Sequence, residues 1–168
     1  TGTKENRAGV DVGMLGTDVG SHALNLALVG VALLAAWCLG RPRGVAWVSF
    51  AGALVVLGTP QLLLGQAGEA PNDMLGVAFL LAAVAIVANE GPDVRSRGGT
   101  YLLVVAAMAA GIALSSKYTL LAPVGIMTIG VVALARRGTR LRTTLVWCTP
   151  LAVTGGYWYL RNWVEVGN

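Results

Sequence analysis

Two carboxylates and an amide lie close together between two apolar stretches of the chain. They are Glu69, Asn72 and Asp73, in the segment Glu-Ala-Pro-Asn-Asp. Carboxylates beside an apolar wall can bind a divalent cation or orient a sugar hydroxyl. The same residue types also favour the start of a helix, because Asn and Asp cap it and acids are stabilised by its positive end. The spacing therefore leaves both helix capping and ligand binding open.

A lysine, Lys117, interrupts two apolar stretches that would otherwise be continuous. An ammonium group near membrane depth is costly unless its side chain extends to the headgroups or pairs with an anion. The position therefore predicts one of two roles for Lys117. It is either a simple anchor at the membrane surface or a contact for an anionic ligand, most naturally a lipid phosphate.

The densest aromatic stretch of the chain, residues 155–163, contains Arg161. Aromatic side chains gather at membrane interfaces, so an aromatic belt is the ordinary interpretation of this stretch. The planar guanidinium of an arginine also matches the geometry of a phosphate, which leaves a phosphate ligand as the alternative. The sequence shows no metal-ligand spacing, no serine triad and no phosphate-binding glycine loop.

Six apolar stretches without a charged residue must position these groups. They cover residues 19–40, 44–68, 74–89, 98–116, 118–135 and 143–160. A helix that crosses a bilayer needs about 20 mostly apolar residues, and all but the third stretch fall within or close to that requirement. We therefore predict an all-α, polytopic transmembrane bundle of about six spans. The expected spans are about 20–40, 44–64, 71–89, 99–115, 118–135 and 143–160.

The composition argues against an ordinary soluble domain. Hydrophobic residues make up 55% of the chain and charged residues 12%, against about 25% charged in soluble domains. The net charge of +4 could suggest a nucleic-acid partner. However, the basic residues form short clusters beside the apolar stretches, which favours membrane anchoring over a phosphate-binding stripe. We expect membrane lipids as partners and no nucleic acid.

The arginines between the apolar stretches predict the orientation. Eight of the twelve basic residues fall in every second connection: Arg41, Arg43, Arg95, Arg97, Arg136, Arg137, Arg140 and Arg142. By the positive-inside rule this side is cytoplasmic. The opposite face then carries 1–18, 69–73, Lys117 and 161–168, so that both ends of the chain and all the candidate residues are expected outside the cytoplasm.

Prolines and glycines predict where single helices bend or stop. Pro60 is expected to kink or end the second helix near its outer end. Pro150 lies inside the sixth helix, and Gly155 and Gly156 lie near its outer end. Small residues are dense throughout, which allows helices to pack closely in lipid.

Four segments, in this order, resemble bacterial polytopic glycosyltransferases of the GT-C class, relatives of protein O-mannosyltransferases and of the lipid A aminoarabinose transferase. They are LGTDVGSHALNLAL, GTPQLLLGQAGEAPNDMLGVAFLLAAVAI, AAGIALSSKYTLLAPV and GGYWYLRNWVEVGN, and the resemblance covers about residues 14–168. It implies an enzyme of the bacterial plasma membrane that serves the cell envelope. Such an enzyme takes a sugar from a polyprenyl-phosphate carrier and transfers it, with inversion, to an extracytoplasmic acceptor.

The resemblance also implies roles for single residues. By motif position, Lys117 and Arg161 are candidates for binding the carrier phosphate, and Glu69 and Asp73 for lining the sugar or acceptor site. The residues that flank them in the motifs complete the expected substrate-binding set: Asn72, Tyr118, Tyr159 and Asn162. The sequence assigns no cofactor, and a divalent cation is the one candidate.

The catalytic base is the element that this resemblance does not supply. In the family it usually lies in the first external loop, and neither Asp11 nor Asp18 sits in a matching motif. We therefore expect that residues 1–168 are an internal piece of one transmembrane domain, with 1–18 an external loop, and that this piece is inactive alone. The base would lie upstream of residue 1.

Two other classes remain open from the sequence. A transporter or channel subunit would also have broken helices and intramembrane charges, and a non-catalytic membrane scaffold would need neither. No charged residue lies in the middle of an expected span, and the polar groups gather on one face. This pattern favours the enzyme over the transporter.

Overall fold

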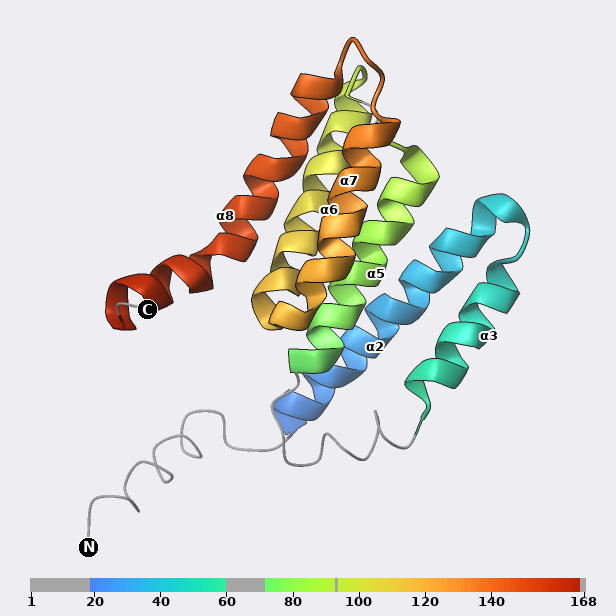
Figure 1. The fold of residues 1–168 in the computed structure, drawn as a ribbon. Coiled ribbons are helices and arrows are strands. Elements are labelled where there is room, and N and C mark those ends of the chain that lie inside the picture. The colour runs from blue at the N-terminus through green and yellow to red at the C-terminus, as the bar shows by residue number, and fades with distance from the viewer. Residues whose placement is uncertain (1–18, 60–71, 93, 167–168) are drawn as a thin grey trace, which may run out of the picture.

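The computed structural model describes residues 19–59, 72–92 and 94–166, and Figure 1 shows their arrangement. The helices are α2 (Val19–Gly40), α3 (Ala46–Leu57), α5 (Asn72–Glu90), α6 (Arg97–Ser116), α7 (Leu121–Leu134) and α8 (Arg140–Val166). Two short 3-10 turns, η1 (Arg41–Arg43) and η2 (Tyr118–Leu120), connect some of them. The described residues contain no β-strand, so the prediction of an all-α bundle is confirmed.

The helices run alternately up and down the bundle (Figure 1). Helix α5 packs against α2 on one side and against α6 on the other. Helix α3 packs against α2 at one edge, and α8 packs against α6 near the opposite edge. Helix α7 contacts α8, α5 and α6. The two helices α6 and α8 therefore run in the same direction, separated in sequence by α7.

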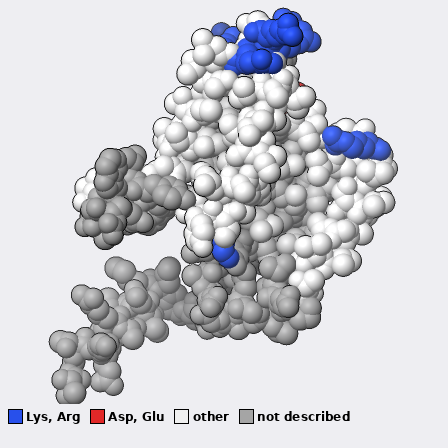
Figure 2. Space-filling model, in the orientation of Figure 1, with Lys and Arg blue, Asp and Glu red and all other residues white. Residues whose placement is uncertain are grey.

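Basic side chains gather at one end of this bundle, as the upper part of Figure 2 shows. That end holds η1, the connection 91–96 and the connection 135–139, with the eight arginines of the sequence prediction. Among the basic residues whose side chains the structure describes, Lys117 is the one at the opposite end. Helix α6 separates Arg97 from Lys117 by 20 residues, or about 30 Å at 1.5 Å per residue, which is close to the thickness of the hydrocarbon layer.

The interior of the bundle is made of small side chains. Among the described residues, twelve of the twenty buried apolar ones are alanines. Large apolar side chains lie outside, for example Leu26, Val55 and Ile126, which are 76%, 72% and 71% exposed. A soluble domain buries its large apolar residues preferentially. Small residues inside and large ones outside are typical of helices that pack in lipid.

Two helical stretches are long and apolar enough to cross a membrane, Ala23–Arg43 and Arg97–Ser116. Three other apolar helical stretches are shorter: Ala46–Leu57, Met74–Glu90 and Tyr118–Leu134. By length and composition the described helices thus include two candidate spans, fewer than the six that the apolar runs predict.

Helix α3 shows why an apolar run overestimates the length of a helix. It ends at Leu57, where the backbone N–H of Gly58 bonds to the carbonyl of Leu54 at 2.8 Å, seven residues before the predicted end at 64. This end lies three residues before Pro60 in the sequence. The residue before a proline is biased away from helical geometry, so the chain leaves the helix early. Pro60 itself lies outside the described residues.

Helix α8 departs from its predicted range in the other direction. It begins at Arg140, three residues before the expected start, and continues through Pro150 and the Gly155-Gly156 pair to Val166. The helix is therefore longer than the predicted span of 143–160, because neither the glycine pair nor Arg161 interrupts it. In Figure 1 the last turns of α8 lie apart from the other helices.

Candidate functional site

The break between α6 and η2 places Lys117 at the end of the bundle opposite the arginines. Lys117 has extended backbone geometry, with φ −155° and ψ 126°, between two helical segments. The hydroxyls of Ser115 and Ser116 donate to the carbonyls of Ile112 and Ala113 at 2.8 and 2.7 Å. The Ser116 bond satisfies the carbonyl of Ala113, one of the last four of α6, which have no backbone partner within the helix. The side chain of Lys117 is exposed.

Tyr118, the next candidate, begins η2. Its side chain is 77% exposed. The turn closes when the N–H of Leu120 bonds to the carbonyl of Lys117 at 3.1 Å. The short break that the sequence predicts between two apolar stretches is therefore present, and it presents Lys117 and Tyr118 together.

A glycine brings the start of α5 against this break. A Cβ on Gly76 would lie 2.6 Å from the Ser116 hydroxyl and 2.7 Å from the Leu120 side chain, so glycine allows this close approach without either side chain moving aside. Asn72 and Asp73 are the first two residues of α5, one turn before Gly76. The positive end of α5 and Lys117 therefore lie at the same end of the bundle. As residues of the first turn of α5, Asn72 and Asp73 lie where the positive end of a helix favours an acidic side chain.

Some candidates fall outside what the structure describes. Glu69 lies outside the described residues, as do the side chains of Asn72 and Asp73. The side chains of Tyr159, Arg161 and Asn162 are also outside them, although the backbone of all three belongs to α8.

Arg161 lies in a helix that touches α6 nearby but then separates from it. A Cβ on Gly155 would lie 3.2 Å from the carbonyl oxygen of Gly111, so the backbones of α8 and α6 almost meet. Lys117 and Arg161 each lie six residues beyond this contact, which is about 9 Å along a helix. The last turns of α8 nevertheless lie apart from α6 (Figure 1). The structure therefore brings the start of α5 to Lys117 but does not pack the turn of Arg161 against it.

At the arginine end, Arg43 joins two helix ends, a contact that the sequence analysis did not single out. Its guanidinium donates to the carbonyls of Leu39 and Ala88 at 2.6 and 3.3 Å and to the side-chain oxygen of Asn89 at 3.4 Å. Asn89 in turn donates to the carbonyl of Cys38 at 2.8 Å. Cations stabilise the C-terminal carbonyls of helices, so this group ties α2 to α5. An arginine and an asparagine directly after apolar runs are the signal that could have revealed it.

A second contact that sequence reasoning missed joins α7 to α8. Trp147 is fully buried, and its indole N–H donates to the Thr128 hydroxyl at 3.0 Å. Thr128 in turn donates to the carbonyl of Val124 at 2.8 Å, within its own helix. A buried indole needs a hydrogen-bond acceptor, so a tryptophan in the middle of an apolar run was a usable signal.

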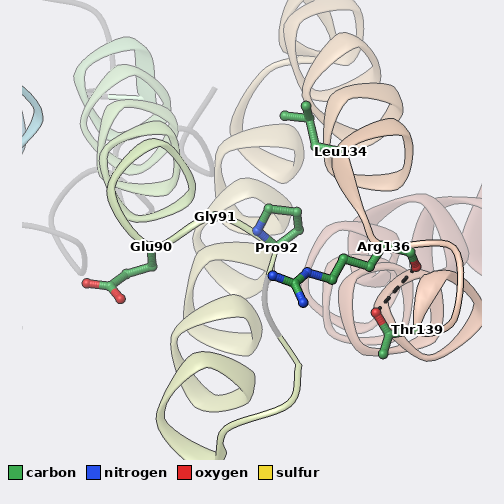
Figure 3. Close-up of a pocket in the computed structure, with 6 residues that line it drawn as sticks. All are labelled: Glu90, Gly91, Pro92, Leu134, Arg136 and Thr139. Carbon is green, nitrogen blue, oxygen red and sulfur yellow. Dashed lines mark hydrogen bonds between the residues drawn. The ribbon is translucent and has the colours of Figure 1, made fainter.

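A pocket of about 300 Å³ opens at the arginine end (Figure 3). It lies between the connection after α5 and the connection before α8. Its lining residues are Glu90, Gly91, Pro92, Leu134, Arg136 and Thr139. The side chain of Arg136 extends toward Pro92, whereas the carboxylate of Glu90 points away from it (Figure 3). The hydroxyl of Thr139 donates to the carbonyl of Arg136 at 3.4 Å.

Within the described ranges, no three His, Cys, Asp or Glu residues lie together as a metal site would require. Comparison of the chain with protein families, with characterised proteins and with solved structures finds no match. The candidate site therefore rests on the residues of this chain alone. It consists of the Lys117 break, Tyr118 and the adjoining start of α5.

Proposed function

We propose that this chain is a multi-pass protein of the bacterial plasma membrane, with about six spans and the arginine end in the cytoplasm. The alanine-rich interior and the large exposed apolar side chains support this arrangement. So does the separation of about 30 Å between the arginine end and Lys117. The shorter apolar helices fit a bilayer that thins locally, or whose flanking side chains extend to the headgroups. Residues 1 and 168 would both lie outside the cytoplasm.

Within that arrangement, the proposed activity is transfer of a sugar from a polyprenyl-phosphate carrier to an extracytoplasmic acceptor. The observation that carries this proposal is the exposed Lys117 in the break beside the first turn of α5. An ammonium group and the positive end of a helix both favour a phosphate. A phosphate on a lipid carrier would reach them from the bilayer, at the outer end of the apolar surface. Asp73 belongs to the same first turn, where a sugar hydroxyl would need an acceptor.

The orientation is tested with two single cysteines in a protein whose Cys38 and Cys148 are replaced by serine. We expect a membrane-impermeant maleimide to label Tyr118→Cys on intact cells and to label Gly138→Cys only after the membrane is opened. Both positions are exposed, and a Cβ on Gly138 meets nothing within 4 Å. Labelling of Gly138→Cys on intact cells would contradict the proposed orientation and the position of the site.

The activity is tested in membranes that contain the complete gene product, supplied with a radiolabelled polyprenyl-phosphate sugar. Lys117→Met should reduce transfer at least about a hundredfold, the usual result of removing one charge-stabilising donor at a reacting centre. Lys117→Arg should retain part of the activity, because the charge survives while its geometry changes.

The matched control is Arg41→Gln, which removes one exposed basic charge at the opposite end and should leave transfer unchanged. Wild-type transfer by Lys117→Met would make the lysine an anchor at the membrane surface only. If the wild-type protein itself transfers no sugar, the transporter and scaffold classes are favoured instead.

A further inference from the structure

The arginines at the cytoplasmic end are not equivalent, because some are bound within the protein and others are not. Arg43 donates to Leu39, Ala88 and Asn89, and Arg140 donates to the carbonyl of Ala133 at 3.3 Å. These two arginines stabilise the ends of α2, α5 and α7.

Three other arginines, around the α7–α8 connection, do not stabilise a helix end in this way within the described residues. Within the part of the chain that the structure describes, no residue accepts a hydrogen bond from the guanidinium of Arg136, Arg137 or Arg142. All three side chains are exposed. They leave a strongly basic surface whose donors are available to an anion from outside the protein.

Arg136 also lines the pocket of about 300 Å³, and its neighbours there are of mixed character. Pro92 and Leu134 supply an apolar wall, and Thr139 supplies a hydroxyl. Among the described lining residues the acidic one is Glu90, and its carboxylate points away from Arg136 (Figure 3). An anion at Arg136 would therefore meet the guanidinium without facing that carboxylate.

The apolar surface beside this pocket indicates what kind of anion it suits. Leu134, in the last turn of α7, is 73% exposed, and Leu141, in the first turn of α8, is 76% exposed. A free phosphate has no apolar part that could contact the exposed leucines next to the arginines. A phospholipid has one, because its acyl chains begin a few bonds away from its phosphate.

We propose that the pocket around Arg136 binds the phosphate of an anionic glycerophospholipid of the cytoplasmic leaflet, with Arg137 and Arg142 adding to the attraction. This site lies at the other end of the bundle from the Lys117 site. It does not depend on sugar transfer, because it can be occupied without a sugar carrier or an acceptor.

The test uses the detergent-purified, delipidated protein and counts bound lipids by native mass spectrometry. Dioleoylphosphatidylglycerol should bind at least about fivefold more tightly than dioleoylphosphatidylcholine, which has the same chains but no net charge. Arg136→Gln should weaken phosphatidylglycerol binding about fivefold, the usual effect of one basic residue near an anionic surface. Arg136→Lys should bind more weakly than wild type and more tightly than Arg136→Gln, since it keeps the charge but not the planar fork.

Arg41→Gln is the control, because it removes the same charge at the same end of the bundle but outside the pocket. It should change phosphatidylglycerol binding less than twofold, and the far-UV circular dichroism of every variant should match wild type. Equal losses for Arg41→Gln and Arg136→Gln would overturn the pocket in favour of diffuse attraction. Equal binding of the two lipids would overturn it as well. So would competition by soluble glycerol phosphate at the concentration of the lipid, which would indicate a site for free phosphate.

Discussion

The contact between α6 and α8 contrasts with the contact between α2 and α3 at the other edge of the bundle (Figure 1). Between α6 and α8, Gly111 and Gly155 allow the two backbones to approach each other directly. The hydroxyl of Thr154 lies 2.8 Å from the carbonyl of Pro150 in its own helix and 3.2 Å from the carbonyl of Met108 on α6. This contact depends on the absence of side chains.

Between α2 and α3, the contact depends on their presence. Trp37 meets Trp47 edge to face with ring centroids 4.6 Å apart, and both rings meet Phe50 at 6.2 Å. Trp47 is 73% exposed, so much of its ring faces outward. In the proposed membrane arrangement, acyl chains can replace a lost ring, whereas no lipid group can restore the contact between two backbones that a new side chain separates. We therefore expect the two contacts to respond very differently to substitution.

The largest expected effect is that of Gly111→Leu. A Cβ at this position would overlap the Thr154 hydroxyl and lie 2.7 Å from the carbonyl oxygen of Leu151 and 3.0 Å from the backbone nitrogen of Gly155. Backbone atoms cannot move aside as a flexible side chain can, so we expect a loss of at least about 3 kcal/mol in the free energy of unfolding. The measurement is titration with SDS in mixed micelles, followed by far-UV circular dichroism.

Gly125→Leu on α7 is the matched control for this change. A Cβ there meets nothing within 4 Å, so the variant should lose less than about 1 kcal/mol. If the two glycine variants unfolded at the same SDS fraction, the α6–α8 approach would not be what holds these helices together.

An intermediate effect is expected for Trp147→Phe, which extends the comparison to the α7–α8 contact. The change removes the hydrogen bond to Thr128 and leaves part of a fully buried volume empty. Together these losses should amount to about 2 kcal/mol in the same titration. Thr128→Val should cost about 1–3 kcal/mol because it leaves the buried indole N–H without an acceptor. The double variant should cost less than the sum of the two, and strict additivity would show that the bond contributes nothing.

The smallest effect is expected for Trp47→Leu at the edge. The variant loses two edge-to-face ring contacts, worth about 0.5–1.5 kcal/mol each at most, but keeps apolar contact with lipid. Since the ring is largely exposed, we expect a loss of no more than about 1 kcal/mol. A loss as large as that of Gly111→Leu would remove the distinction between the two contacts.

The sequence predicts the class of fold well because apolar runs and the charges between them are long-range patterns. It places α2, α5 and α6 within a few residues of their observed bounds. It misplaces the end of α3, because hydrophobicity does not determine where a helix stops. Helix α3 ends at Leu57, whereas α8 continues past the apolar stretch to Val166 because neither Pro150 nor the glycine pair interrupts it.

The candidate site is predictable only where it follows from the chain order. The exposed Lys117 in a short break is such a feature, since it needs only the two neighbouring apolar stretches. The approach of α5 to this break depends on Gly76, and nothing in the sequence marks that glycine among the chain's 23. The pocket at Arg136 was missed for the same reason, because its two connections are distant in sequence and meet only through the packing of α5, α6 and α7.

The position of α5 between α2 and α6 also sets the order in which the bundle can assemble during synthesis. Helices α2 and α6 are long and apolar enough to enter a bilayer unaided, but the apolar part of α5, Met74–Glu90, is shorter. When α5 has been synthesised, its partner on one face, α2, is already complete. Its partner on the other face, α6, ends 26 residues later. At about 5–20 residues per second, the ribosome needs about one to five seconds for that stretch. In the proposed membrane arrangement, a nascent chain would carry a half-packed helix during this interval, when membrane chaperones and proteases would have their best access to it.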